Sequence, residues 1–239
     1  MQQHIFENSN HPKLKACGYY PCGRRICPWC ASRLAKAHRA EIRAYAASTG
    51  LPALYIVVSV KSSPSIVAGL EALASTRAEF TSRGWLNRVS TSWFRFTELT
   101  RSPGAWHWHD NFVVFGHPEQ LAVLDAEVEG RWLASASRVG AGAHAEGVHV
   151  RSVYDSYSLA DYISKGLMRP AHQGDNPTPG DILHASTHNQ DAADNWAQIE
   201  AMWMGRAPSL VSKSRAPRDR TPSQTPVEGQ GKAGFELTA

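Results

Sequence analysis

The chain has 239 residues, of which 42% are hydrophobic and 19% charged, so it can bury a core and is not expected to be disordered throughout. Its 25 Lys and Arg residues exceed its 21 Asp and Glu residues, and the net charge of +4 allows a polyanionic partner without requiring one. The longest apolar run, residues 54–58, is far too short to span a membrane, and the N-terminus lacks the apolar segment of a secretory signal. We therefore expect a cytoplasmic protein with no membrane partner.

All four cysteines lie close together near the N-terminus, within residues 17–30. Because the chain shows no export signal, such a cluster indicates a metal site rather than disulfides. Four thiolates match a closed tetrahedral Zn²⁺ site, which has no open position and therefore a structural role. The expected ligands are Cys17, Cys22, Cys27 and Cys30. Two alternatives stay open: His11 or His38 replaces one cysteine, or the four reduced cysteines bind no metal.

The segment around the cysteines is strongly basic. Between Lys13 and Arg43 it carries eight basic residues and one acidic residue, Glu41. We therefore predict a basic, cysteine-rich zinc-binding module over residues 1–48 that faces an anion. The alternative is that these basic residues lie on a solvent-exposed face of a helix that follows the metal-binding turn and bind no anion.

The pattern becomes regular from residue 53. Strands are predicted at 53–60, 93–100, 106–115 and 148–153, and helices are predicted after Pro64, from Pro118 and over 156–167. The order β-α-β-β-α-β, followed by a helix, predicts an α+β fold with a ferredoxin-like split βαβ arrangement. In that arrangement an antiparallel sheet carries its helices on one face.

The C-terminal part of the chain has a different composition. Residues 174–180 are predicted to form a loop, and residues 191–204 one more helix. From residue 205 to 239 the chain is rich in Pro, Ser, Gly, Arg and Lys and poor in large apolar residues. Such a segment cannot bury enough surface to offset its ordering entropy, so we expect a disordered tail.

A first group of candidate site residues lies on the two central predicted strands. Since residues two apart on a strand share a face, His107, His109 and Asn111 are expected to point the same way. Antiparallel pairing across the short turn at 101–105 brings Glu98 close to them. Two imidazoles and a carboxylate predict an open divalent-metal site. The alternative is that these histidines are surface residues without a function. The apolar residues between them, however, indicate a strand that packs in the core, and polar residues at every second position of such a strand indicate a common function.

A second candidate group lies on the helix predicted over 156–167. Tyr162 and Lys165 are one helical turn apart and are therefore neighbours. A nearby ammonium and a metal-polarised phosphate would both help a tyrosine hydroxyl to attack. Tyr154 and Tyr157 are rival tyrosines, and a packed aromatic beside a solvated lysine is the alternative reading.

The order of these parts resembles the HUH endonuclease superfamily, most closely the rolling-circle replication initiators of bacterial plasmids and their transposase relatives. The resemblance covers roughly residues 17 to 206. The segments that carry it are CGRRICPWC (22–30), ELT (98–100), GAWHWH (104–109) and YISK (162–165).

The resemblance implies a nicking domain over residues 49–204 that acts on single-stranded, hairpin or cruciform origin DNA, with a host helicase as a further partner. Tyr162 would attack the scissile phosphate, giving a 5′-phosphotyrosine and a free 3′-hydroxyl, with Lys165 stabilising the phenolate or the leaving oxygen. Mg²⁺ or Mn²⁺ bound by Glu98, His107 and His109 would neutralise phosphate charge. The basic module would hold DNA through Arg24, Arg25, Arg33, Lys36 and Arg39.

The chain departs from the family pattern in two places. Relatives often carry three alternating histidines, whereas the third position here is Asn111, so the metal-binding pair is either His107 with His109 or His109 with Asn111. Some relatives carry a second tyrosine where this chain has Gly166. Three alternative functions stay open: a non-catalytic zinc-stapled DNA-binding protein on the same scaffold, a transposase or relaxase of the same superfamily, and an unrelated metal hydrolase that uses activated water.

Overall fold

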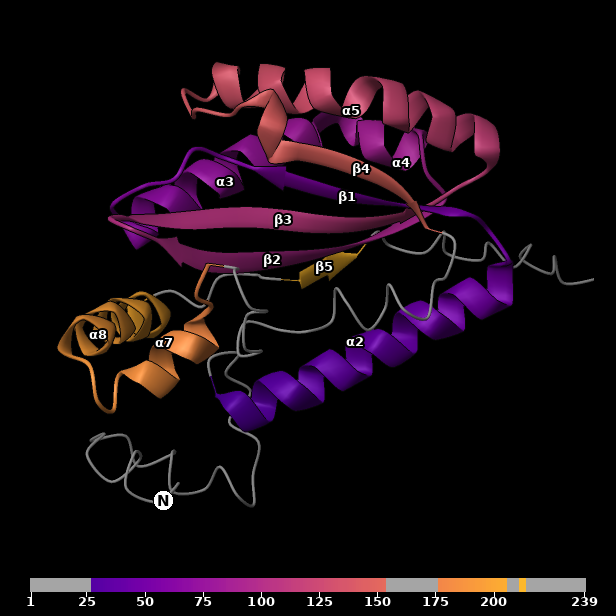
Figure 1. The fold of residues 1–239 in the computed structure, drawn as a ribbon. Helices are drawn as coiled ribbons and strands as arrows, with labels where there is room; N and C mark the ends of the chain where they lie inside the picture. Colours follow the sequence, from indigo (N-terminus) through magenta and orange to yellow (C-terminus); the bar gives the residue numbers. More distant parts are fainter. Residues whose placement is uncertain (1–26, 154–175, 206–210, 214–239) are drawn as a thin grey trace, which may run out of the picture.

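The computed structural model of the chain describes residues 27–153, 176–205 and 211–213. It is an α+β protein, as the sequence predicts, with helices packed against an antiparallel sheet (Figure 1). The elements are α2 (Pro28–Thr49), β1 (Ala53–Ser59), α3 (Ile66–Phe80), η2 (Ser82–Gly84), α4 (Trp85–Arg88), β2 (Ser92–Ser102), β3 (Ala105–Phe115), α5 (Pro118–Arg138), η3 (Ala145–Gly147), β4 (Val148–Val153), α7 (Pro179–Ala185), α8 (Gln190–Gly205) and β5 (Val211–Lys213).

The strands lie in the order β4-β1-β3-β2-β5, and every neighbouring pair is antiparallel. The four strands expected from the sequence are present, with ends that differ by no more than two residues. β2 and β3 form a hairpin, and its turn contains Gly104 at φ 75°, a backbone conformation that favours glycine. The long helices α3 and α5 connect strands that are not neighbours in the sheet.

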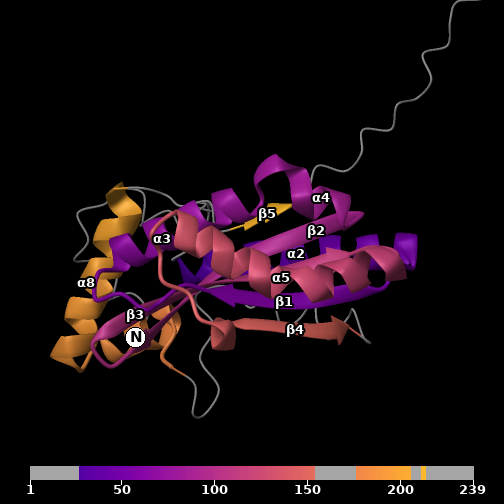
Figure 2. The same cartoon turned by 90° about the horizontal axis from the view of Figure 1, so that it is seen from above.

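The main hydrophobic core lies between the sheet and the layer formed by α3, α4 and α5 (Figures 1 and 2). β3 contributes Trp106 and Trp108 to it, each 1% exposed, and their indole N–H groups donate to Gln198 Oε1 and to the Ile66 carbonyl. The Ser65 side chain accepts a hydrogen bond from the Ala68 amide and so caps the start of α3. Both tryptophans are therefore structural residues of the core.

The opposite face of the sheet is covered over one half by α2. The apolar side of α2, centred on Ile42, packs on Phe94, Phe96, Val113 and Phe115. Figure 1 shows α2 running beneath the sheet, with its last turn near the start of β1 and its first turn toward α7. Pro28 in the first turn and Gly50 at φ 60° after the last turn define the ends of this helix.

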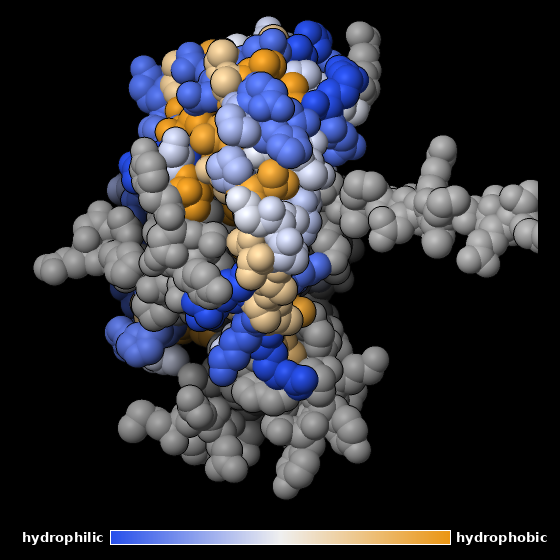
Figure 3. All heavy atoms as spheres, turned by 90° about the vertical axis from the view of Figure 1, so that its right-hand side faces the viewer, coloured by the Kyte–Doolittle hydropathy of each residue, from blue (hydrophilic) through white to orange (hydrophobic). Residues whose placement is uncertain are grey.

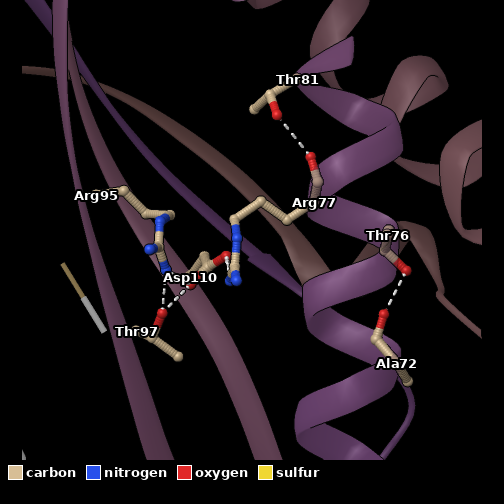
Figure 4. A network of polar contacts seen from close by, with 7 residues as sticks. All are labelled: Ala72, Thr76, Arg77, Thr81, Arg95, Thr97 and Asp110. Carbon is tan, nitrogen blue, oxygen red and sulfur yellow. Dashed lines mark hydrogen bonds and ion pairs between the residues drawn. The ribbon is translucent and has the colours of Figure 1, made fainter. Parts of the chain in front are cut away.

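A buried ionic network joins β2, β3 and α3 on the face of the sheet that α3, α4 and α5 cover (Figure 4). Asp110 is fully buried, and its carboxylate accepts from Arg77 Nη1 at 2.9 Å and from Arg95 Nη1 at 3.1 Å. Thr97 contacts both Arg95 and Asp110. Burial lowers the pKa of Arg95, and the Asp110 charge acts against that effect. The carboxylate therefore compensates two guanidinium groups in a place where an unpaired charge is costly.

Two expectations about the C-terminal part need correction. The predicted loop at 174–180 contains the start of α7, because the Thr178 side chain caps this helix and the Asp181 carboxylate accepts a hydrogen bond from the Thr178 backbone amide. In the tail that we expected to be disordered, Val211–Lys213 forms β5, because its backbone pairs with β2 at Phe94–Phe96. The helix predicted over 156–167 lies outside the described residues.

Few large hydrophobic side chains are exposed on the described surface. The only large hydrophobic side chains classed as exposed in the described part are those of Val67, Val123 and Val139. On the side drawn in Figure 3, apolar residues form small groups separated by hydrophilic ones. No helix in the described ranges is long and apolar enough to cross a membrane.

We expect Asp110→Asn to lower the free energy of unfolding by about 3–5 kcal/mol, because it removes the negative charge that the buried Arg95 and the partly buried Arg77 share. Urea denaturation of the purified protein measures this change. The matched control is Glu127→Gln, which removes an exposed ion pair with Arg131 and should cost about 0–1 kcal/mol. An Asp110→Asn cost no larger than the control would show that the network contributes little stability.

Candidate functional site

The β2–β3 register brings the predicted site residues to one face of the sheet. Glu98 lies directly opposite His109, and Thr100 lies opposite His107. Since side chains alternate along a strand, these residues point away from the core that buries Trp106, Trp108 and Asp110. They occupy the half of this face that is formed by the start of β3, beyond the part packed against Ile42 of α2.

Glu98 and His109 are in direct contact. His109 Nε2 lies 3.0 Å from Glu98 Oε2, and the two side chains are 15% and 26% exposed. The ring centroids of His107 and His109 are 5.6 Å apart. Two imidazoles and one carboxylate therefore adjoin each other at a partly open position.

The surroundings of His107 favour its neutral form. Burial lowers the pKa of His107, and the neighbouring His109 lowers it further. Its Nδ1 lies 3.1 Å from Ser62 Oγ, in the loop between β1 and α3. A neutral imidazole is the form that binds metal ions, so this residue is prepared as a ligand at neutral pH.

Asn111 continues the row of polar side chains on β3 but is 2% exposed. Its Oδ1 accepts a hydrogen bond from the Tyr55 hydroxyl of β1 at 2.5 Å. Its Nδ2 is buried and has no hydrogen-bond partner among the described residues, and the same is true of His109 Nδ1. Two unsatisfied polar atoms in adjacent positions of one strand face are unusual in a folded protein and call for a partner.

The side chains of Glu98, His107 and His109 are of the kinds that bind a divalent cation. In the structure, however, Glu98 and His109 contact each other. Within the described ranges, no three His, Cys, Asp or Glu side chains gather closely enough to hold a metal ion. The Glu98–His109 contact occupies two of the three expected ligands. Because the backbone register already places Glu98 opposite His109, cation binding requires new side-chain rotamers and no change of strand pairing.

Two of the four predicted zinc ligands are described. Cys27 occupies the N-cap position of α2 without a side-chain capping hydrogen bond, and Cys30 lies in the first turn; both are buried, at 6% and 2% exposure. His38 lies two turns further along, about 12 Å from Cys30 at a rise of 1.5 Å per residue, and its ring contacts Phe96. Its ring therefore packs on the sheet.

The basic residues of α2 differ in their exposure to solvent. Arg33 and Lys36 are exposed and Arg39 is half-buried. Their helical positions lie to one side of Ile42, which faces the sheet. This basic side of α2 therefore lies on the same side of the sheet as His107 and His109.

Several predicted site residues lie outside the described part of the chain: Cys17, Cys22, Arg24, Arg25, Tyr162 and Lys165. Two residues that contact the site, Tyr55 and Ser62, were not predicted from the sequence. The β1–β3 pairing places Tyr55 beside Val113 and diagonal to Asn111, and no residue pattern in the sequence specifies that register.

Comparison of the chain with protein-family models, with curated proteins and with solved structures found no match. The functional assignment therefore depends on the residues and their geometry.

Proposed function

We propose that the protein is a rolling-circle replication initiator that nicks single-stranded origin DNA through attack by Tyr162. The observation that carries this proposal is the adjoining Glu98, His109 and His107 on a partly open face of the sheet. A carboxylate and two imidazoles suit a hard or borderline divalent cation such as Mg²⁺ or Mn²⁺.

The fold gives independent support at a coarser level. Both the β-α-β-β-α-β order and the sheet order β4-β1-β3-β2 agree with a ferredoxin-like split βαβ arrangement, which we propose for this domain. The two central strands, β1 and β3, then form the platform of the site, and the hairpin of β2 with β3 supplies the cation ligands.

The cation would be held by Glu98, His107 and His109, and when bound it would supply charge stabilisation for the phosphate oxygens. The residues of the chain perform the remaining steps. Tyr162 Oη would form a bond to the scissile phosphorus while the 3′-oxygen leaves, and Lys165 would stabilise the phenolate or the leaving oxygen. The phosphotyrosine conserves the energy of the broken phosphodiester, so resealing requires no nucleotide.

The described residues that flank the segment containing Tyr162 lie at opposite ends of the sheet. Val153, at the end of β4, pairs with Ala53, whereas the Pro177 carbonyl accepts from the Arg101 amide at the opposite end of β2. The register places Ala53 level with Ser92, and nine residues of β2 separate Ser92 from Arg101. At roughly 3.3 Å per residue this distance is about 30 Å. Pro177, which follows the segment that contains Tyr162, therefore lies at the end of the sheet that carries His107.

The basic module would position the DNA. Arg33 and Lys36 lie exposed on α2, on the same side of the sheet as the histidines, and the buried thiols of Cys27 and Cys30 suit a structural Zn²⁺ completed by Cys17 and Cys22. A cytoplasmic location and a host helicase as partner follow from the resemblance to the HUH endonucleases and are part of the same proposal.

We predict that Tyr162→Phe abolishes the covalent protein–DNA adduct formed with a labelled single-stranded oligonucleotide in Mn²⁺ and leaves DNA binding unchanged, because only the nucleophilic oxygen is lost. His109→Ala should abolish cleavage as well. A denaturing gel measures the adduct, and a binding titration measures affinity.

The control for that experiment is Tyr157→Phe, which should form the adduct normally. An adduct from Tyr162→Phe would contradict the assignment of the nucleophile. Cleavage without any adduct would favour a metal hydrolase that uses activated water, and binding without cleavage would favour a non-catalytic DNA-binding protein.

We also predict that the double substitution Arg33→Ala with Lys36→Ala weakens single-stranded DNA binding, because two phosphate contacts are lost. The slope of log affinity against log salt should fall by roughly 1.4. The charge-matched control is Arg131→Ala with Arg138→Ala on α5, which covers the other face of the sheet. Equal weakening by both pairs would show that only the net charge matters and would contradict a DNA path along α2.

A further inference from the structure

The two unsatisfied polar atoms of the site are complementary. Asn111 Nδ2 is a hydrogen-bond donor, and His109 Nδ1 is an acceptor whenever the ring proton lies on Nε2. Both atoms are buried without a partner in the described part of the chain. They belong to residues two apart on one face of β3, and buried polar atoms without a protein partner are commonly satisfied by a buried water.

Tyr55 determines which atom Asn111 offers to its neighbours. The Tyr55 hydroxyl donates to Oδ1, so Nδ2 remains for the rest of the site. A cation binds an amide through its oxygen, because the amide nitrogen has no available lone pair. In this arrangement Asn111 is therefore a hydrogen-bond donor to the site and is not a third metal ligand.

We propose that Tyr55, Asn111, His109 and Glu98 form one hydrogen-bond relay across β1, β3 and β2 that fixes the tautomer of His109. The Tyr55 O–H donates to Asn111 Oδ1, Asn111 Nδ2–H donates through one water to His109 Nδ1, and His109 Nε2–H donates to Glu98 Oε2. All donors point in the same direction along the relay, so each hydrogen bond polarises the next. Asn111 is a positioning residue that acts through His109.

The relay explains why Glu98 and His109 contact each other directly. With its proton on Nε2, His109 directs a donor at Glu98, and each occupies the other's metal-binding atom. A carboxylate at position 111 would instead accept a hydrogen bond from Nδ1–H and leave the Nε2 lone pair for a cation, the arrangement found around many metal-bound histidines. This use of the relay rests on the proposed function, whereas the tautomer itself does not.

The test is the ¹⁵N chemical shifts of the His109 ring, measured without metal or DNA at about pH 8, where an ordinary histidine is neutral. We expect the Nε2–H tautomer in the native protein and the Nδ1–H tautomer in Asn111→Asp, with at least about tenfold tighter Mn²⁺ binding by that variant. Tyr55→Phe, which removes the anchor of the amide, should give a detectable fraction of Nδ1–H. If Asn111→Asp does not fold, Tyr55→Phe decides the question.

The control is Ser62→Ala, which removes a contact of His107 and should leave the His109 tautomer unchanged. An Nδ1–H tautomer in the native protein would mean that the amide is turned around, and this would overturn the relay. An unchanged tautomer in both Asn111→Asp and Tyr55→Phe would overturn it as well. If the tautomers behave as expected but no protein–DNA adduct forms with the native protein, the relay stands and the nicking function fails.

Discussion

The site depends on the difference between the two faces of β3, of which one packs in the core and the other carries the candidate site residues. Asp110 lies between His109 and Asn111 in the sequence and points to the opposite face, where it holds Arg77 and Arg95. A register slip of one residue would place the histidines in the core and the aspartate on the open face. The buried ionic network therefore specifies both the pairing of β3 with β2 and the direction in which His107 and His109 point.

One face of the sheet therefore stabilises the fold, and the other face carries the candidate site residues. The tryptophans of β3 and the helices α3 and α5 enclose the main core on one face. On the other face, α2 packs over the apolar half and leaves the polar half to Glu98, His107 and His109. The ligands therefore project from a rigid strand pair, which limits the freedom of their backbone and leaves only their rotamers to adjust to a bound group.

The sequence predicts most of the fold because its strands have clear signals. The alternation of β3 identifies the shared face of His107 and His109, and the short turn after β2 identifies Glu98 as their neighbour. The three residues of β5 carry no such signal, because their pairing with β2 depends on a distant edge strand. The start of α7 does carry one, the Thr178–Asp181 capping pair, which a search for capping boxes would have found. Tyr55 could not be assigned, because its contact with Asn111 depends on the long-range register of β1 with β3.

The most direct test of the account is whether a cation binds to the two histidines of β3. Pulsed electron paramagnetic resonance of Mn²⁺ added to the purified protein detects nitrogen nuclei bound to the ion. The account predicts coupling to two imidazole nitrogens, reduced to one in His107→Ala and in His109→Ala. A Mn²⁺ signal without nitrogen coupling in the native protein would contradict a metal centre on this face of the sheet.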